Sequence, residues 1–214
     1  MRTPSRSTFR HRWPALALVV LAAGLGWAGV GYPGGGGQSP LDRLKNTGRC
    51  PQCDLSGANL TNAQLVNADL SGATLVDANL SGANLSGATL GVARLDGANL
   101  SGANLSGTIL VSANFSGASL TGANLTGARI DSADLGGATL SRANLSGATL
   151  IGATLIAANL SGTNLSGATL RWANLPMANL SGANLSGATL VGANFSSAIW
   201  VDGHRCGPNA VGGC

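Results

Sequence analysis

Four cysteines are the residues of this sequence best suited to chemistry, and they stand in two pairs on either side of a long repetitive body. Cys50 and Cys53 precede that body, and Cys206 and Cys214 follow it. A Cys-x-x-Cys pair is typical of zinc sites, redox proteins and local disulfides. In an oxidising compartment the simplest interpretation is one local disulfide within each pair. Thioredoxin-like redox chemistry, zinc binding, intermolecular bonds and a buried free thiol at Cys53 stay open as alternatives.

Other residues that perform catalysis are scarce in the repetitive body. Residues 54–200 contain no His, Glu, Lys, Cys or Tyr, and His11 and His204 lie outside them. Six Asp remain, but an Asp acts as an acid or base only when it is positioned against a bound substrate. We therefore expect a non-enzymatic protein with no catalytic residue, no cofactor and no metal site in the body.

The positive charge belongs to the N-terminal part of the chain. Residues 1–53 carry seven basic side chains against one Asp, whereas residues 54–200 carry four Arg and six Asp, a net charge of −2. The formal charge of +4 for the whole chain is thus no argument for a nucleic-acid partner, and we expect none.

Residues 1–30 have the layout of an export signal. Basic residues 2–12 precede an apolar run over 15–30, which ends among small residues around Gly26 and Ala28. A cleaved signal peptide and an uncleaved membrane anchor both fit. In either case the body is translocated, so it is exported (to a periplasm, a lumen or the extracellular space) or anchored through this segment. Residues 31–52 are expected to form a Gly-rich linker and an N-terminal cap.

The body repeats with a period of five. Every fifth residue from 55 to 200 is apolar, and 26 of these 30 residues are Leu. Ala stands two residues before almost all of them. This period matches neither the 3.6 residues of a helical turn nor the alternation of a strand. It fits a square coil in which each pentapeptide forms one side, the chain turns a corner, and 20 residues complete a circuit.

The repeat unit resembles that of the pentapeptide-repeat family. In that family each unit begins with Ala, continues with Asp or Asn, and has Leu in third place. The units 58–62 (ANLTN) and 68–72 (ADLSG) match this pattern, and the resemblance covers about residues 53–202. It implies an all-β fold, a right-handed quadrilateral β-helix (a β-solenoid). Thirty units give about 7.5 coils, or a rod of about 36 Å at the spacing of β-strands.

Both ends of such a stack need protection from aggregation. Ser39 followed by Pro40 is typical of a helix start, so a short helix with Leu41 and Leu44 is expected to cover the first coil. At the other end we expect Trp200 to act as a lid, followed by a Cys-containing tail at 203–214.

The outer surface is predicted to be asymmetric. We number the sides by their inward residues: Leu55 on side one, Leu60 on side two, Leu65 on side three and Leu70 on side four, each recurring every 20 residues. Before the C-terminal lid, over residues 54–198, sides four and one carry eighteen of the twenty outward charged or bulky apolar side chains. These two sides are here called the variable half. Sides two and three, the uniform half, show mainly Gly, Ser and Asn. Side three presents a column of Asn residues whose amides are expected to hydrogen-bond along the stack.

The variable half is a candidate surface for an unknown protein partner, since Trp and Arg are enriched in interaction hot spots. Its candidate residues are Arg94, Arg129, Arg171, Trp172 and Met177. The alternative is that duplication of a decapeptide kept the uniform half regular while the other sides drifted.

The sequence thus predicts an exported repeat scaffold with a structural or protein-interaction role, and end or face stacking would make it a homo-oligomer. A redox or metal-binding protein that uses Cys50 and Cys53 is the alternative. A gyrase-protecting DNA mimic, a role of some members of the family, needs an acidic cytoplasmic rod, whereas this body is near neutral and follows an export signal.

Overall fold

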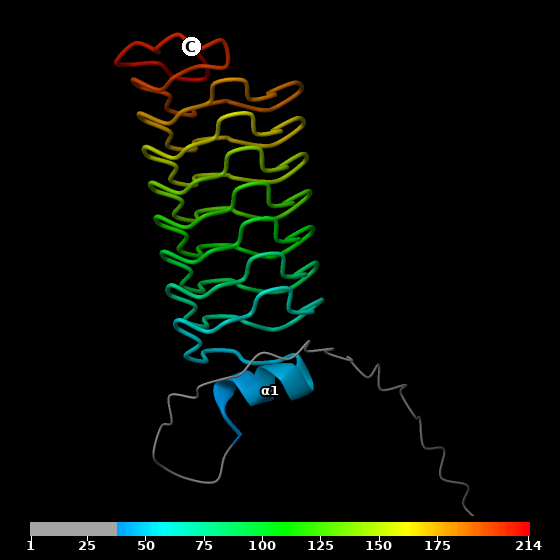
Figure 1. The fold of residues 1–214 in the computed structure, drawn as a ribbon. Helices are drawn as coiled ribbons and strands as arrows, with labels where there is room; N and C mark the ends of the chain where they lie inside the picture. Colours follow the sequence, from blue (N-terminus) through cyan, green and yellow to red (C-terminus); the bar gives the residue numbers. More distant parts are fainter. Residues whose placement is uncertain (1–37) are drawn as a thin grey trace, which may run out of the picture.

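The computed structural model describes residues 38–214, which form a short helix followed by a rod of stacked coils (Figure 1). The predicted export segment at 1–30 and the Gly-rich stretch of the linker lie outside the described residues. Between residues 38 and 214, no helix is long and apolar enough to cross a membrane.

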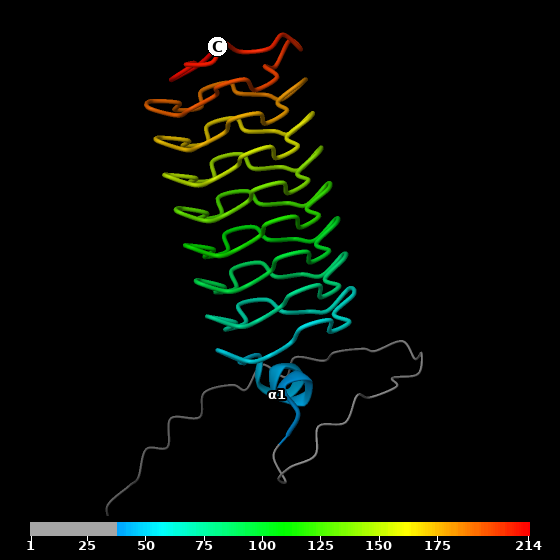
Figure 2. The same cartoon turned by 90° about the vertical axis from the view of Figure 1, so that its left-hand side faces the viewer.

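Helix α1 spans Pro40–Thr47 and lies against the first coil, as Figures 1 and 2 show. Ser39 caps its N-terminus, because its hydroxyl oxygen accepts a hydrogen bond from the Asp42 amide at 3.1 Å. Gly48 ends the helix in the left-handed conformation, with φ of 66°. Such a conformation suits Gly, which has no Cβ. Leu44 is buried, so the capping helix expected from the sequence is present.

The stack is held together by parallel β-bridges that join residues 20 apart. They run from Arg49↔Asp69 to Asn179↔Ile199 without a change of register. Twenty residues, or four pentapeptides, therefore complete one circuit of the coil. The expected β-helix is built from isolated bridges and not from extended strands. A corner every five residues leaves each side room for one bridging residue, such as Asn59 or Gln64.

Each corner is a tight turn with a fixed backbone requirement. At the corner after Leu55 the amide of Ala58 donates to the carbonyl of Leu55 at 3.0 Å, and Gly57 has φ of 64°. A positive φ at the third residue is typical of a type II turn, which favours Gly. The third position is at positive φ in all 30 corners between Gln52 and Ser197: eighteen of these residues are Gly and twelve are not.

The core is one continuous column of Leu and Ala along the rod axis. Thr108 and Thr163 occupy inward Ala positions and are also buried. Their hydroxyls donate to the carbonyls of Leu105 at 2.7 Å and Leu140 at 2.9 Å. Because a buried hydroxyl is costly only when it lacks a partner, both substitutions fit the core.

The Asn column on side three forms the predicted ladder. Asn104 donates from Nδ2 to Oδ1 of Asn84, and Asn124 to Asn104, at 3.2 Å each. One step is broken, since Asn144 donates to the hydroxyl of Thr126 at 3.0 Å. The ladder then resumes, with Asn164 donating to Asn144 at 3.1 Å.

The C-terminal tail folds back over part of the last coil (Figure 1). It forms two antiparallel bridges, Asn194↔Val211 and Ile199↔Arg205. These bridges cover sides one and two, whereas Leu185 and Leu190 on sides three and four remain partly exposed. Trp200 is partly buried and packs edge-on against Phe195, with ring centroids 5.0 Å apart. The predicted Trp200 lid is therefore one part of a cap that the tail completes.

Candidate functional site

The bulky residues of the variable half stand at strained corner positions. Trp172 and Met177 occupy the third residue of their turns, with φ of 54° and 59°. Their exposed fractions are 60% and 57%. Val92 has the same conformation, φ of 59°, and is 69% exposed. A left-handed backbone costs a residue other than Gly about 1–3 kcal/mol, and side chains this exposed regain little of that through burial.

Corner residues other than Gly are distributed unevenly around the rod. Five lie on side four and four on side one, against three on sides two and three together. The nine on the variable half are Gln52, Val92, Ser112, Ser132 and Trp172, with Asp77, Ala157, Met177 and Ser197. The strain therefore coincides with the surface that the sequence marked as distinctive.

The indole of Trp172 is held in one position by its neighbours. The guanidinium carbon of Arg171 lies 4.8 Å from the centroid of the Trp172 ring, in a cation–π contact. On the next coil, a Cβ atom added to Gly192 would come within 2.3 Å of Trp172 Cδ1. The indole therefore lies along the rod over Gly192 and depends on the absence of a side chain there.

The structure does not bring all five candidate residues together. Arg171 and Trp172 are in contact, and Met177 lies one corner further along the chain. Arg129 is two bridges below Thr169 on side four, or about 10 Å at the strand spacing. Arg94 lies four bridges below Asn174 on side one, where its guanidinium pairs with Asp96 at 3.2 Å. Among the five candidates, Arg171 and Trp172 are the pair that the structure places in direct contact.

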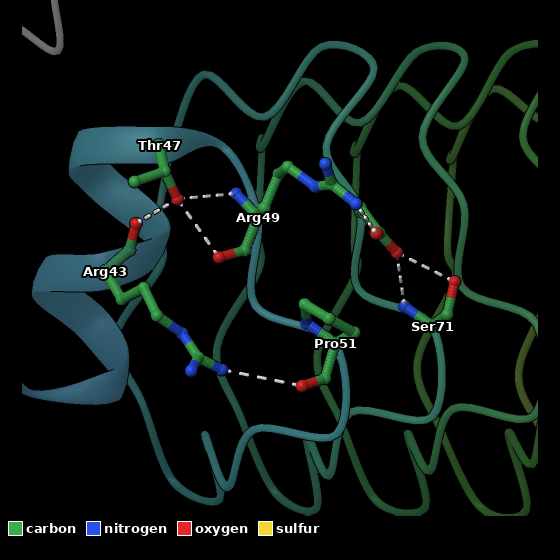
Figure 3. Close-up of polar contacts among 6 residues, drawn as sticks. Arg43, Thr47, Arg49, Pro51 and Ser71 are labelled. Atoms are coloured by element: carbon green, nitrogen blue, oxygen red, sulfur yellow. Dashed lines mark hydrogen bonds and ion pairs between the residues drawn. The ribbon is translucent and has the colours of Figure 1, made fainter.

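The Cys50–Cys53 pair belongs to the N-terminal cap. Its Cα atoms are 5.4 Å apart and its sulfur atoms lie at disulfide distance. The exposed fractions of Cys50 and Cys53 are 0% and 5%. The guanidinium of Arg43, on α1, contacts Cys53 Sγ and also donates to the carbonyl of Pro51 at 3.5 Å (Figure 3). The pair is thus enclosed between the helix and the first coil.

A polar network ties the same helix to the second coil (Figure 3). The Thr47 hydroxyl donates to the carbonyl of Arg43 at 2.7 Å and accepts from the amide of Arg49 at 3.1 Å. Arg49 pairs with Asp69 at 3.2 Å. Hydrogen bonds from the Ser71 hydroxyl and amide, with a smaller contribution from Arg49, lower the pKa of Asp69.

The second pair, Cys206 and Cys214, lies in the C-terminal tail. Its Cα atoms are 5.2 Å apart and its sulfur atoms also lie at disulfide distance. Cys206 is 3% exposed, whereas Cys214 is exposed. Nε2 of His204 lies 3.0 Å from Cys214 Sγ, and Nδ1 lies 2.5 Å from an oxygen of Asp202. Hydrogen bonds from the amide and then the imidazole of His204 lower the pKa of Asp202.

Residues 38–214 contain no group of three or more His, Cys, Asp or Glu side chains arranged to bind a metal ion. An open hollow of about 480 Å³ lies on side four beside Pro51, Gln52 and Val92. No charged side chain lines it, so it offers no acid, base or metal ligand.

Comparison with known proteins identifies the repeat. The family model described as pentapeptide repeats matches eight copies in this chain, over residues 53–91, 93–127, 128–171 and 163–199. The chain belongs to the pentapeptide repeat family. None of the curated proteins compared with it gives a significant match.

Solved pentapeptide repeat proteins are similar to this chain. HetL, which is involved in heterocyst differentiation regulation in the cyanobacterium Nostoc sp. strain PCC 7120, is 30% identical over 73% of this chain and 92% of its own, with a TM-score of 0.24. The protein alr5209 from Nostoc PCC 7120 is 47% identical over 39% of this chain and 69% of its own, with a TM-score of 0.38. A thylakoid lumen protein from Arabidopsis thaliana is 24% identical over 77% of this chain and 75% of its own, with a TM-score of 0.24.

Within this pentapeptide repeat protein, sequence reasoning missed the contact between His204 and Cys214. The tail has no repeat, so no periodicity placed its side chains. The sequence signal that could have found the contact is the occurrence of Asp202 and His204 just before Cys206, in the only part of residues 54–214 that contains His or Cys.

Proposed function

We propose that this protein is an exported scaffold whose repeat body has no enzymatic role and binds a protein partner through the variable half, with Arg171, Trp172 and Met177 at the centre of the contact. The observation that carries the proposal is Trp172 itself. Its backbone is in a conformation that favours Gly, and its indole is largely exposed. The rod gains little stability from this residue, so a role in binding accounts for it better than a role in folding.

Drift after duplication is the competing explanation. The types of residue found at the exposed corners of the variable half argue against it. Selection for stability at a left-handed corner favours Gly, Asn or Asp, which tolerate this conformation. Val92, Trp172 and Met177 are β-branched or bulky, which makes them costly choices. They also share the variable half, although corners on all four sides have the same geometry.

The local geometry is suited to a hot spot. The contact with Arg171 and the space over Gly192 hold the indole of Trp172 in place before any partner arrives. Binding then requires little further ordering of this side chain, which is a major cost of association. The fitting partner is a protein surface with an apolar pocket for the indole and a carboxylate at its rim for Arg171.

The finer features of the fold and location form part of the same proposal. We place the repeats in a right-handed rod of about 7.5 coils, about 36 Å long at the strand spacing. Export is supported by the signal-like pattern of residues 1–30 and by two cysteine pairs at disulfide distance, because disulfides persist in oxidising compartments.

A pair of glycine substitutions tests the partner surface. Trp172→Gly removes the indole and relieves the backbone strain, so the rod stays folded while binding is lost. Arg142→Gly is the matched control, because Arg142 is also an exposed corner residue at positive φ, but on side two. Tagged wild-type and variant chains are used to capture partners from the native envelope fraction, and each captured protein is quantified by mass spectrometry.

The expected result is a protein captured by the wild type and by Arg142→Gly and depleted at least tenfold with Trp172→Gly. Equal recovery with both variants, or no specific capture by the wild type, would refute the proposed surface. Capture of a second copy of the same chain, lost with Trp172→Gly, would identify the partner as another copy of this protein, bound by face stacking in a homo-oligomer.

A further inference from the structure

Near the C-terminus, Asp202, His204 and Cys214 form a line of contacts. Asp202 accepts from His204 Nδ1, so Nε2 is the ring nitrogen that faces Cys214 Sγ, at 3.0 Å. A carboxylate that holds an imidazole in one orientation beside a nucleophile is a recurring arrangement for activating a thiol. The hydrogen bonds from His204 favour the charged form of the Asp202 carboxylate and so lower its pKa.

The two sulfur atoms of this pair differ in access. Cys214 is exposed, and Cys206 lies beneath it at 3% exposure. An incoming molecule therefore reaches Cys214 first, and the sulfur of Cys206 lies at disulfide distance from that of Cys214. The Cys50–Cys53 pair has no such asymmetry, because both of its cysteines are enclosed under α1.

The electrostatic surroundings of Cys214 are simple. Asp202, His204 and Arg205 are the charged or titratable side chains of residues 201–214 other than the cysteines, and the last coil, residues 181–200, contains none. The Arg205 guanidinium donates to the carbonyl of Ser197 at 3.0 Å. Of these three side chains, His204 is the one whose ring contacts Cys214 Sγ.

We propose that Cys206 and Cys214 form a thiol–disulfide exchange site, in which Cys214 is the nucleophile, Cys206 the resolving cysteine, His204 the acid–base group and Asp202 the residue that positions it. The substrate class is a disulfide, carried by a small molecule or by a protein. This activity is separate from the proposed binding surface and does not depend on it.

The exchange proceeds in two balanced steps from the reduced pair. The Cys214 thiol gives its proton to His204 Nε2, and the thiolate attacks a substrate disulfide RS–SR′. A bond forms between Sγ and SR, the S–S bond breaks, and R′S⁻ leaves with the electron pair and takes the proton from His204. Cys206 then attacks Cys214 Sγ, which restores the intramolecular disulfide and releases RS⁻, and RS⁻ takes up the proton that Cys206 gave up.

The net reaction converts the protein dithiol and RS–SR′ into the protein disulfide, RSH and R′SH. Two electrons pass from the two cysteines to the substrate. The same steps in reverse, with a dithiol as reductant, return the protein to its reduced form.

A redox titration of the full chain compares the two pairs within one molecule. The protein is equilibrated in graded ratios of reduced to oxidised glutathione, trapped by alkylation, and each cysteine is quantified by peptide mass spectrometry. We expect the Cys206–Cys214 pair to become half-reduced at a ratio at least tenfold less reducing than the Cys50–Cys53 pair. Reduction of both pairs at the same ratio, or of Cys50–Cys53 first, would overturn the proposal.

A pH profile tests the role of the imidazole. In a Cys206→Ser chain, Cys214 is a single free thiol whose alkylation by iodoacetamide is followed from pH 5 to 10. We expect a midpoint below the value of about 8.5 for an ordinary thiol. His204→Gln should return the midpoint to that value and slow alkylation at pH 6 about tenfold, with a smaller loss for Asp202→Asn.

Asp96→Asn, on side one of the rod, is the control and should leave the profile unchanged. A profile with the ordinary midpoint that His204→Gln does not move would refute the assignment. Oxidised glutathione and a scrambled disulfide protein, offered separately to the reduced wild type, identify the substrate as small or macromolecular by the faster exchange. No exchange above the uncatalysed rate with either would also overturn it.

Discussion

Truncation of one leucine in the middle of the column measures how the rod is stabilised. Leu125 is 1% exposed and lies between Leu105 and Leu145 of the neighbouring coils, both fully buried. Leu125→Ala removes buried methyl groups and leaves a cavity that rigid neighbours cannot fill, at a cost of about 2–5 kcal/mol. At about 2–4 °C per kcal/mol for a chain of this size, the melting temperature should fall by about 4–20 °C.

Leu185→Ala is the matched control at the end of the same column. Leu185 is partly exposed because the tail leaves side three of the last coil uncovered, so its truncation should cost less than about 2 kcal/mol. Both variants are melted by circular dichroism and unfolded in urea. Leu125→Asp places a carboxylate among Leu and Ala side chains, and we expect it to unfold the rod locally or entirely. An unchanged melting temperature for Leu125→Asp, or equal losses at positions 125 and 185, would refute a continuous stacked core.

Three further predictions concern corners and charges. Trp172→Gly and Arg142→Gly should each raise the free energy of unfolding by about 1–2 kcal/mol, because a left-handed corner no longer carries a Cβ atom; thermal melts will show this, and a loss of stability would contradict it. Gly192→Ala should destabilise the rod more than Gly122→Ala, since a Cβ at Gly192 meets the Trp172 ring whereas a Cβ at Gly122 meets nothing within 4 Å. The two glycines have similar φ values of 72° and 66°, so the comparison isolates the contact with the ring. Equal urea midpoints would show that the indole does not lie where the structure has it. The lowered pKa of Asp69 means that its contribution to stability is complete above the unfolded value of about 3.9 and is lost as the pH falls through the lower folded value. Asp69→Asn should therefore reduce the difference in stability between pH 6 and pH 2, and an identical pH dependence would exclude this contribution.

The fold could be predicted because every repeat carries the apolar residue that forms the core. Leu at every fifth position has one economical solution, a square coil with an apolar axis, and Ser39 with Pro40 marks the start of the capping helix. The Asn ladder followed from the 20-residue circuit alone. What the pattern could not show is that each side forms one isolated bridge, since this depends on how many residues a corner uses.

The candidate sites were less predictable, for two physical reasons. The distinctive character of Trp172 could be read from the sequence, but its strain could not, because the sign of φ at a corner depends on the turn type. The contact between His204 and Cys214 depends on the path of the tail, which reverses direction after Val201 and pairs antiparallel with the last coil. No repeated residue specifies that reversal.

The constant 20-residue register also determines how such a protein can change in length. Adding or losing one full circuit lengthens or shortens the rod while every outward column keeps its partners above and below. Adding a single pentapeptide leaves the inner column intact but rotates everything after it by a quarter turn, so that a residue from one side moves to the next. An insertion of any other size that stays within the coil moves polar residues to the axis, whereas one that leaves the coil as a surface loop does not. Steps of five residues thus preserve the core, and steps of twenty preserve the surface columns. The two copies of SGANLSGATL at 81–90 and 181–190, which are five circuits apart, present identical residues on the same three sides.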